Sequence, residues 1–258
     1  MVTLDLNLIA AHLEGLEETI IHRLIDRAQF ATNPRAYRVG ESGFEGAGEK
    51  SLFDIRLRYQ EEMDAAFGRY RVPEERPMHR DLPPPRRTVR PPETPLQIDD
   101  HDLVNVTPEI VAGYLGFLPR LCDVAPADDG QYGSSVEHDV LAIQALGRRV
   151  HYGALYVGES KYRSAARAMD TLLQSGDRDG VLRHITRPEV EERIVRRVAQ
   201  KVDYVQAPIN TAVRRRIDPN LVLDLYRDLI IPLTKEGELR YLFNRRATGS
   251  SGFRSETP

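Results

Sequence analysis

Three groups of polar residues have the types and the spacing to bind and transform a small anionic molecule. The first lies on one predicted helix and contains Arg148, Arg149, His151 and Lys161. Guanidinium groups gathered in this way suit carboxylate groups, because one arginine can donate two parallel hydrogen bonds to one carboxylate. The alternative for Arg149 is a place on a solvated helix face.

The second and third groups each pair a polar residue with a glutamate four residues further on. Arg187 precedes Glu191, and Thr234 precedes Glu238. This spacing places each pair on one face of a helix. Ordinary structural roles remain open for both pairs, since Arg187 and Glu191 could form a surface ion pair that contributes little to stability.

Motifs for other kinds of chemistry are missing from the sequence. It has no glycine-rich dinucleotide motif, no phosphate-binding loop, no HExxH pattern and no paired cysteines. The single cysteine, Cys122, follows an apolar segment and is expected to be a buried structural thiol. His151 is likewise expected to be structural. We therefore expect neither a metal site nor a cofactor.

Composition favours an ordinary globular protein of the cytoplasm. The 258 residues are 41% hydrophobic and carry a net charge of −3, which argues against general binding to nucleic acid or to a membrane. No apolar run approaches the length that spans a bilayer, and residues 1–7 do not read as a signal peptide. One cysteine permits no internal disulfide, which fits a reducing compartment.

Helical periodicity accounts for most of the chain. Apolar residues at spacings of three and four predict helices from Ile9 to Leu24 and from Leu52 to Phe67. Asn33-Pro34 is expected to end the first helix and Gly68 the second. A third helix is predicted from Thr107 to about Leu118.

The second half of the chain has the same character. Ser134 or Ser135 is expected to cap a long helix that runs to about Tyr162. Thr186 to Glu189 resembles a capping box for a further helix. Asp218-Pro219 is expected to start the last helix, which Pro232 should kink.

The predicted fold is all-α, with one domain of long helices over residues 1–245. Eight of the seventeen prolines lie between Pro73 and Pro95, so this segment should be a non-helical connection. Residues 246–258 show no apolar pattern and are expected to form a flexible tail.

Four ordered blocks of the sequence resemble the eukaryotic-type chorismate mutases of fungi and plants. They are Leu16 to Arg27, Arg69 to Pro77, the block from Gly133 to Tyr162, and Ile230 to Leu242. The third block includes Leu146-Gly147-Arg148-Arg149-Val150-His151-Tyr152-Gly153 and Glu159-Ser160-Lys161-Tyr162. Because the blocks span nearly the whole chain, the resemblance is more specific than any single motif.

The resemblance implies the rearrangement of chorismate to prephenate in the biosynthesis of phenylalanine and tyrosine. The reaction is unimolecular, so an enzyme supplies positioning and a fixed electrostatic field. In the family, the position of Arg149 binds a substrate carboxylate, and that of Lys161 donates to a carboxylate and to the ether oxygen. The position of Glu191 accepts from the ring hydroxyl. Glu238 matches a carboxylic acid that donates to the ether oxygen, and Thr234 lies beside it.

The resemblance also implies regulation and assembly. The family binds tyrosine or tryptophan at a dimer interface, and the matching residues here are Arg69, Gly133 and Ser134. A further family arginine falls on Gly68 and a threonine on Glu137, so this site is only partly kept. A homodimer is the expected assembly.

The sequence departs from the family pattern at three places. The first helix has Ala10 where the family has a carboxylate-binding arginine, and Arg187 stands where the family has asparagine. Arg149 and Lys161 are twelve residues apart instead of eleven, which would turn the lysine away by about 120°. We hypothesise that Arg187 replaces the lost guanidinium, and that a π-bulge between Tyr152 and Glu159 absorbs the additional residue.

Two other functions follow from these departures. One is a mutase-like enzyme that acts on a modified chorismate in a specialised pathway. The other is a catalytically silent helical protein with a regulatory or interaction role. Retention of the five site residues argues against the silent alternative.

Overall fold

The chain is built of helices joined by loops. The computed structural model describes residues 4–91, 93–122 and 127–246. No strand occurs among the described residues, and none of their helices has the length and apolarity needed to cross a membrane. The all-α prediction is therefore confirmed. The predicted tail begins with Arg246, and its remaining residues lie outside the described ones.

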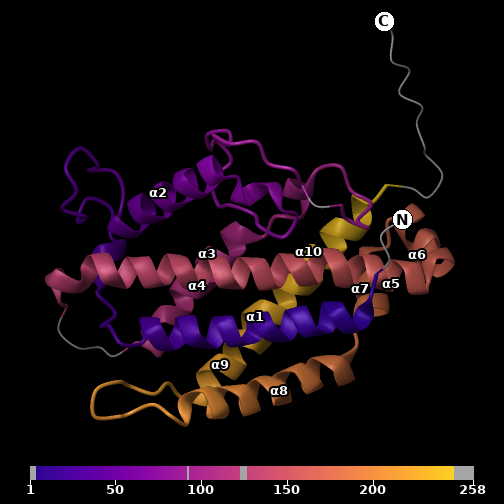
Figure 1. Cartoon of the computed structure of the whole chain (residues 1–258). Coiled ribbons are helices and arrows are strands. Elements are labelled where there is room, and N and C mark those ends of the chain that lie inside the picture. The colour runs from indigo at the N-terminus through magenta and orange to yellow at the C-terminus, as the bar shows by residue number, and fades with distance from the viewer. Residues whose placement is uncertain (1–3, 92, 123–126, 247–258) are drawn as a thin grey trace, which may run out of the picture.

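Two long helices, α1 (Leu6–Arg27) and α4 (Tyr132–Tyr152), lie side by side across the molecule (Figure 1). The side chain of Asp5 caps α1 by accepting from the backbone N–H groups of Asn7 and Leu8. α4 begins at Tyr132, and Gln131 stands at its cap position. The expectation that Ser134 or Ser135 caps this helix is wrong, because a short 3₁₀ turn leads directly into it.

Sequence signals locate α2 (Leu52–Phe67) correctly. Ser51 and Asp54 form a capping box at its start. Gly68 ends it with a φ of 86°, a conformation that residues with a Cβ adopt only at a cost. The described residues of the proline-rich segment between Pro73 and Pro95 form no helix, as predicted. α3 (Thr107–Leu121) then begins with Pro108 in its first turn.

The chain beyond α4 contains more helices than predicted. They are α5 (Gly158–Ser164), α6 (Ala166–Gln174), α7 (Arg178–Ile185), α8 (Pro188–Gln206), α9 (Pro219–Leu225) and α10 (Ile231–Phe243). α6 and α7 are short and were not predicted. The expected capping box at Thr186 is wrong, since its hydroxyl donates to the carbonyl of Leu182. Asp218 caps α9 as predicted, and a π turn (Tyr226–Ile230) joins α9 to α10 just before Pro232.

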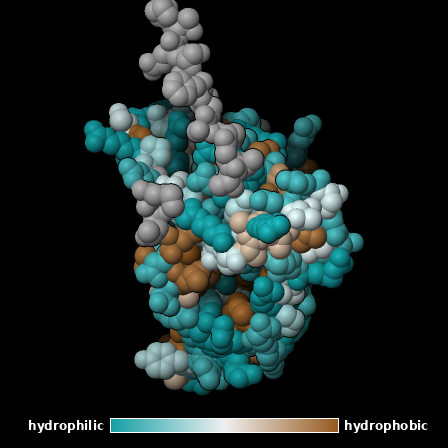
Figure 2. All heavy atoms as spheres, turned by 90° about the vertical axis from the view of Figure 1, so that its right-hand side faces the viewer, coloured by the Kyte–Doolittle hydropathy of each residue, from teal (hydrophilic) through white to brown (hydrophobic). Residues whose placement is uncertain are grey.

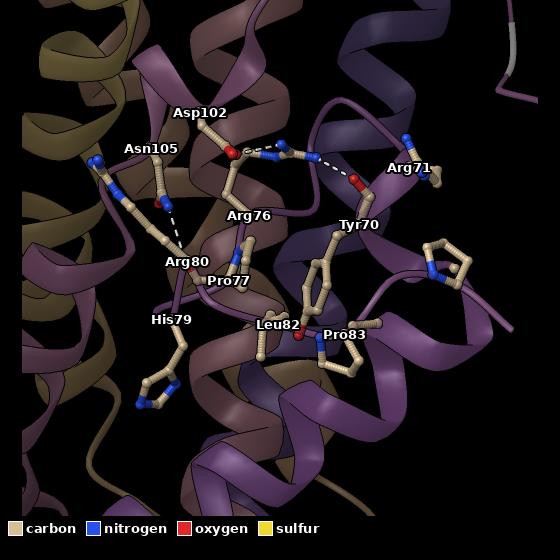
Figure 3. Close-up of a pocket in the computed structure, with 13 residues that line it drawn as sticks. Tyr70, Arg71, Arg76, Pro77, His79, Arg80, Leu82, Pro83, Asp102 and Asn105 are labelled. Carbon is tan, nitrogen blue, oxygen red and sulfur yellow. Dashed lines mark hydrogen bonds and ion pairs between the residues drawn. The ribbon is translucent and has the colours of Figure 1, made fainter.

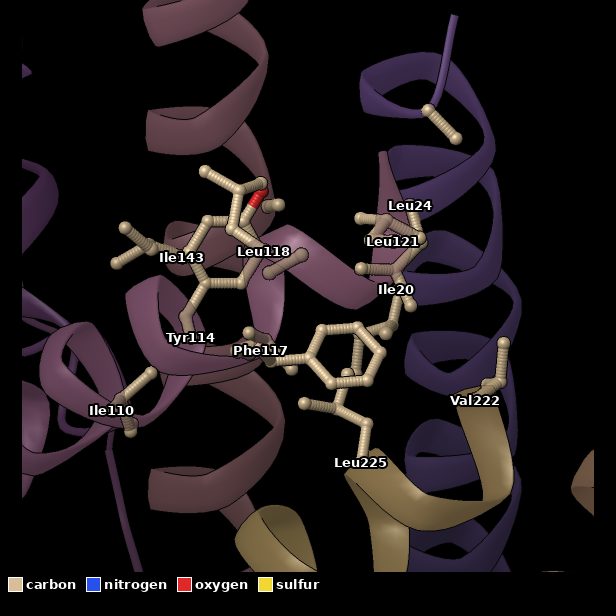
Figure 4. Packing of buried hydrophobic residues seen from close by; sticks show 14 of the residues in the cluster. Ile20, Leu24, Ile110, Tyr114, Phe117, Leu118, Leu121, Ile143, Val222 and Leu225 are labelled. Atoms are coloured by element: carbon tan, nitrogen blue, oxygen red, sulfur yellow. The ribbon is translucent and has the colours of Figure 1, made fainter. Parts of the chain in front are cut away.

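The main hydrophobic core lies between α1, α3, α4 and α9 (Figure 4). Tyr114 and Phe117 of α3 reach toward Ile143 of α4 and toward Leu225 of α9. A smaller cluster joins α10 to α5, α6 and α7. This second cluster fixes the end of the molecule that carries Lys161.

A buried polar cluster links three helices within the main core. Arg27 of α1 and Asp139 of α4 form an ion pair with an Nε–Oδ1 distance of 2.7 Å, and both side chains are fully buried. Tyr37 and Tyr114 also donate to the Asp139 carboxylate, at 2.6 Å and 2.8 Å. The Arg27 guanidinium further donates to the sulfur of Cys122. Burial of this kind is tolerated only because each charged group has several partners.

Replacing Asp139 by alanine is expected to destabilise the protein by about 3–5 kcal/mol, because Arg27 would keep a buried charge without its partner. Urea denaturation followed by far-UV circular dichroism measures this change. Glu41→Ala is the control, since Glu41 and Arg35 form an exposed pair at 3.1 Å and its loss should change stability by no more than about 0.5 kcal/mol. Equal effects of the two substitutions would contradict the structural role assigned to Asp139.

Candidate active site

A π turn places Arg149 and Lys161 on the side of α4 and α5 that faces α10. Arg149 lies near the end of α4, Lys161 lies in α5, and Gly153–Val157 between them form a π turn. Such a turn closes over one residue more than an α-helical turn and so absorbs the additional residue. The predicted π-bulge is therefore confirmed. Lys161 contacts α10, and a methyl group added at Gly153 would lie close to both Arg149 and Thr234, so both cations face this helix.

Two glycines allow α10 to approach the π turn closely. A methyl group on Gly237 would lie 2.6 Å from the Cβ of Ala154. One on Gly153 would lie 2.9 Å from Cγ2 of Thr234 and 3.1 Å from Nη1 of Arg149. These distances leave no room for a side chain at either position. The crossing therefore sets the distance between the cations of α4–α5 and the polar residues of α10.

Glu238 is the carboxyl group at this crossing. Its Oε2 lies 2.7 Å from Nζ of Lys161, and only 2% of the residue is exposed. Burial raises the pKa of Glu238, while Lys161 and then Lys235 oppose the shift. Lys161 retains 26% exposure of its side chain, so a ligand can reach this pair. Figure 2 views the end of the molecule where α5 lies and shows hydrophobic side chains around a hollow.

Arg149 is a buried cation with an unused donor. The residue is 3% exposed, and its Nε has no hydrogen-bond partner among the described residues. Burial lowers the pKa of the Arg149 guanidinium, with Tyr226 and Glu17 acting in the opposite direction. The Tyr226 hydroxyl is also buried without a partner in the described part of the chain. A free buried donor of this kind is prepared to bind an anion.

Glu191 and Thr234 lie at the edges of the same group. Glu191 of α8 accepts from Nζ of Lys235 at 3.1 Å and 3.2 Å. Lys235 was not among the predicted site residues, although it lies in the quoted block beside Thr234. The hydroxyl of Thr234 donates to the carbonyl of Ile230 at 2.7 Å, and its methyl group faces Gly153. α10 thus presents Thr234, Lys235 and Glu238 to one region.

Arg187 does not join this group. It is exposed at the cap position of α8 and donates to the backbone carbonyls of His184 and Thr186. The position of the missing cation, Ala10, is also exposed. The geometry therefore gives no support to Arg187 as a replacement, because its guanidinium is held by the loop before α8. Arg148, 41% exposed, faces Glu74 and Glu75 instead of α10.

A second charged network that the sequence did not reveal lies beside Arg149. Glu17 of α1 is fully buried and accepts two hydrogen bonds from Arg197 of α8, at 2.5 Å and 2.9 Å. Lys201 lies 3.3 Å from the same carboxylate. The spacing of four residues between Arg197 and Lys201 is the only available sequence signal, and it equally fits a solvated face. This network attaches α8 to α1 next to the buried guanidinium.

The residues expected to bind an effector are separated within one chain. Arg69 donates to Gln144 of α4 and pairs with Asp64 and Glu75. Gly133 lies eleven residues before Gln144 on this helix, which corresponds to about 16 Å. One copy of the chain therefore does not place Arg69 beside Gly133 and Ser134.

His151 and Cys122 have the structural roles predicted for them. His151 is fully buried; one ring nitrogen accepts from the N–H of Val106 at 3.0 Å, and the other donates to the carbonyl of Gly147 at 2.7 Å. Burial lowers the pKa of His151 to about 3, so the ring is neutral. Burial also raises the pKa of Cys122 to about 11. No cluster of metal-binding side chains occurs among the described residues.

Known proteins resemble this chain in sequence and in structure. It is 36% identical over 242 residues to chorismate mutase 1, chloroplastic, of Petunia hybrida, covering 89% of this chain and 72% of that protein. It is 32% identical over 251 residues to chorismate mutase of Saccharomyces cerevisiae, covering 94% and 95% of the two chains. No family model matches the chain.

Solved structures extend the likeness to three dimensions. The Aro7p chorismate mutase of Candida albicans in complex with L-Trp matches with a TM-score of 0.86 and 29% identity, covering 94% of this chain and 92% of that one. The protein AtCM1 with phenylalanine in its allosteric site matches with a TM-score of 0.80 and 32% identity, covering 92% and 94%. The similarity therefore includes the helical architecture that carries the site.

Gly237→Ala is expected to destabilise the protein by about 1–3 kcal/mol, because the methyl group would overpack the crossing with Ala154. Thermal and urea unfolding measure the change. Gly15→Ala is the matched control: Gly15 lies inside α1 with nothing within 4 Å of an added methyl group. That substitution should stabilise the helix by roughly 0.5–1 kcal/mol. A stabilised Gly237→Ala protein would show that the crossing is not tightly packed.

Proposed function

The chain belongs to the chorismate mutase family of plants and fungi and is an isomerase of this kind, and we propose that Arg149, Lys161 and Glu238 form its catalytic centre. The observation that carries this assignment is the 2.7 Å contact of Lys161 on α5 with the buried carboxyl of Glu238 on α10, with the buried Arg149 facing the same helix. The activity is the rearrangement of chorismate to prephenate in aromatic amino acid biosynthesis.

The reaction needs a shaped and charged site instead of a reactive group. Chorismate carries two carboxylates and rearranges within one molecule, so no nucleophile or general base takes part. A rigid arrangement of donors lowers the barrier when it is complementary to the compact reacting conformation. Side chains held on packed helices meet this requirement, since they need little reorganisation.

Each site residue then has a distinct role. Arg149 binds a substrate carboxylate and uses the Nε that lacks a partner. Lys161 leaves Glu238 to donate to a carboxylate and to the ether oxygen. Glu238, once protonated, donates to that ether oxygen as its bond to carbon breaks. Glu191 accepts from the ring hydroxyl. Thr234 shapes the site beside Arg149.

Substrate binding should favour the protonated form of Glu238. In the free site the carboxyl has a cationic partner 2.7 Å away. A bound dianion would take Lys161 as its own partner and would add negative charge nearby. Both changes raise the pKa of a buried carboxyl that is already shifted upward by burial.

Turnover of chorismate is therefore expected to fall as the pH rises through the raised pKa of Glu238, because only the protonated carboxyl can donate. Glu238→Gln should flatten the profile, since an amide donates at every pH. Formation of prephenate by purified protein, followed from about pH 4 to 9, measures both profiles. A pH profile that Glu238→Gln leaves unchanged would contradict the role of Glu238. Absence of rearrangement above the uncatalysed background would contradict the catalytic assignment as a whole.

We propose that two copies of the chain form a homodimer with an effector site between them. α2 exposes an apolar row in which Tyr59, Met63 and Phe67 are 55%, 50% and 69% accessible, and residues four apart share one helix face. The separation of Arg69 from Gly133 and Ser134 within one chain is resolved if each subunit supplies one half of the site. Similar proteins bind tryptophan or phenylalanine, and tyrosine or tryptophan is the effector class proposed here.

Met63→Asp should dissociate the homodimer, because it places a charge in the centre of this apolar row. Sedimentation velocity measures the assembly, and the response of activity to tyrosine and tryptophan measures the effector site. The expected result is a monomer without an effector response. Thr19→Asp, an exposed change on α1, is the control and should leave the dimer intact. A dimeric Met63→Asp protein would exclude α2 as the interface.

A cytoplasmic location is also proposed. The single cysteine is buried beside Arg27, and no internal disulfide can form. A chain that is stabilised without disulfides suits a reducing compartment.

A further inference from the structure

A pocket lies outside the catalytic group, where the proline-rich segment folds back over residues 100–105 (Figure 3). Three guanidinium groups line it, from Arg71, Arg76 and Arg80, and the only carboxylate in its lining belongs to Asp102. None of the predicted catalytic residues lines this pocket, nor do Arg69, Gly133 and Ser134, although Gly68, the position of a further family arginine, does. Its excess of positive charge and its position therefore need a separate explanation.

Arg76 makes the pocket more than a group of surface arginines. Its side chain is 8% exposed and pairs with Asp102 at 2.6 Å. Its other terminal nitrogen donates to the carbonyls of Tyr70 and Val72. The remaining donor, Nε, is buried and has no partner among the described residues. A buried guanidinium held by three acceptors with one donor left over is a rigid site for an anion.

Arg71 and Arg80 add two further positive charges to the lining of the pocket. Both are exposed, and neither has an ion-pair or hydrogen-bond partner for its guanidinium among the described residues. Figure 3 shows Tyr70 beside Leu82 and Pro83, which form an apolar wall. Burial, with Glu61 and Asp64 nearby, raises the pKa of Tyr70, so its hydroxyl remains protonated. The pocket thus offers fixed donors together with a small apolar surface.

We propose that this pocket binds a small oxyanion, either a phosphate group or the carboxylate of a molecule of a few carbons. The cavity volume of about 180 Å³ limits the ligand, because sites for drug-sized molecules measure roughly 300–1,000 Å³. The oxyanion accepts from Arg76, while the exposed guanidinium groups of Arg71 and Arg80, which lie on opposite sides of Arg76, add positive charge that attracts it. Any carbon atoms of the ligand pack against Leu82 and Tyr70.

Isothermal titration calorimetry of the full chain with inorganic phosphate and, separately, with malonate tests the proposal. Saturable binding of either probe is expected, and the probe that binds more tightly identifies the group. The double substitution Arg71→Gln with Arg80→Gln should raise Kd at least about tenfold. These residues are exposed, so the variant should fold, which its circular dichroism spectrum checks.

Two control variants test whether the probes bind in this pocket. Arg90→Gln with Arg196→Gln removes the same charge from exposed residues outside the pocket and should leave Kd unchanged. Arg149→Gln alters the catalytic group and should also retain binding. Loss of binding in either control, or a Kd unaffected by the Arg71 and Arg80 substitutions, overturns the proposal. Absence of saturable binding by both probes overturns it as well.

Discussion

The proposed catalytic group depends on one close crossing between α10 and the π turn. Gly153 and Gly237 allow the two backbones to approach, and neither position has space for a methyl group. The π turn brings Lys161 back into line with Arg149, and the crossing brings Glu238 within hydrogen-bond distance of Lys161. Backbone geometry therefore places the charges, and the charged side chains occupy positions that packing has already set.

This arrangement determines which charged groups are paired in the substrate-free site. Lys161 is paired with Glu238, Lys235 with Glu191, and Arg197 with Glu17. Arg149 differs because its Nε has no acceptor within the described residues. On the proposed assignment, a ligand with two carboxylates displaces the carboxyl of Glu238 from Lys161, whereas Nε of Arg149 can donate to the ligand without losing an existing hydrogen bond. Binding and protonation of Glu238 are coupled for this reason.

Local signals in the sequence predicted the helix ends that depend on local contacts. Both ends of α2 could be placed from helical periodicity and the glycine that ends it, and Asp218 marked the start of α9. The π turn was inferred because Arg149 and Lys161 are one residue further apart than the matching residues of the family, since periodicity alone does not reveal it. α6 and α7 are too short for a clear apolar pattern. The caps expected at Ser134 or Ser135 and at Thr186 failed because a 3₁₀ turn leads into α4 at Tyr132 and because the Thr186 hydroxyl donates to the carbonyl of Leu182.

The site itself was only partly visible in the sequence. Arg149, Lys161 and Glu238 could be named because family blocks contain them. Lys235 and Arg197 could not, since a charged residue with helical spacing looks the same on a solvated face as beside an active site. Arg187 failed as a replacement for the opposite reason: its type suited the role, but the loop before α8 holds its guanidinium outside.

The unpartnered guanidinium of Arg149 has a consequence for how the enzyme evolves. A buried charge without full compensation costs folding free energy, so an apolar side chain of similar volume at this position would favour the folded state while removing the group that we propose binds the substrate. Thermostability and catalysis therefore impose opposite selection on residue 149. On the proposed assignment, a variant of this chain chosen for stability alone would lose Arg149 and with it the proposed donor to the substrate carboxylate.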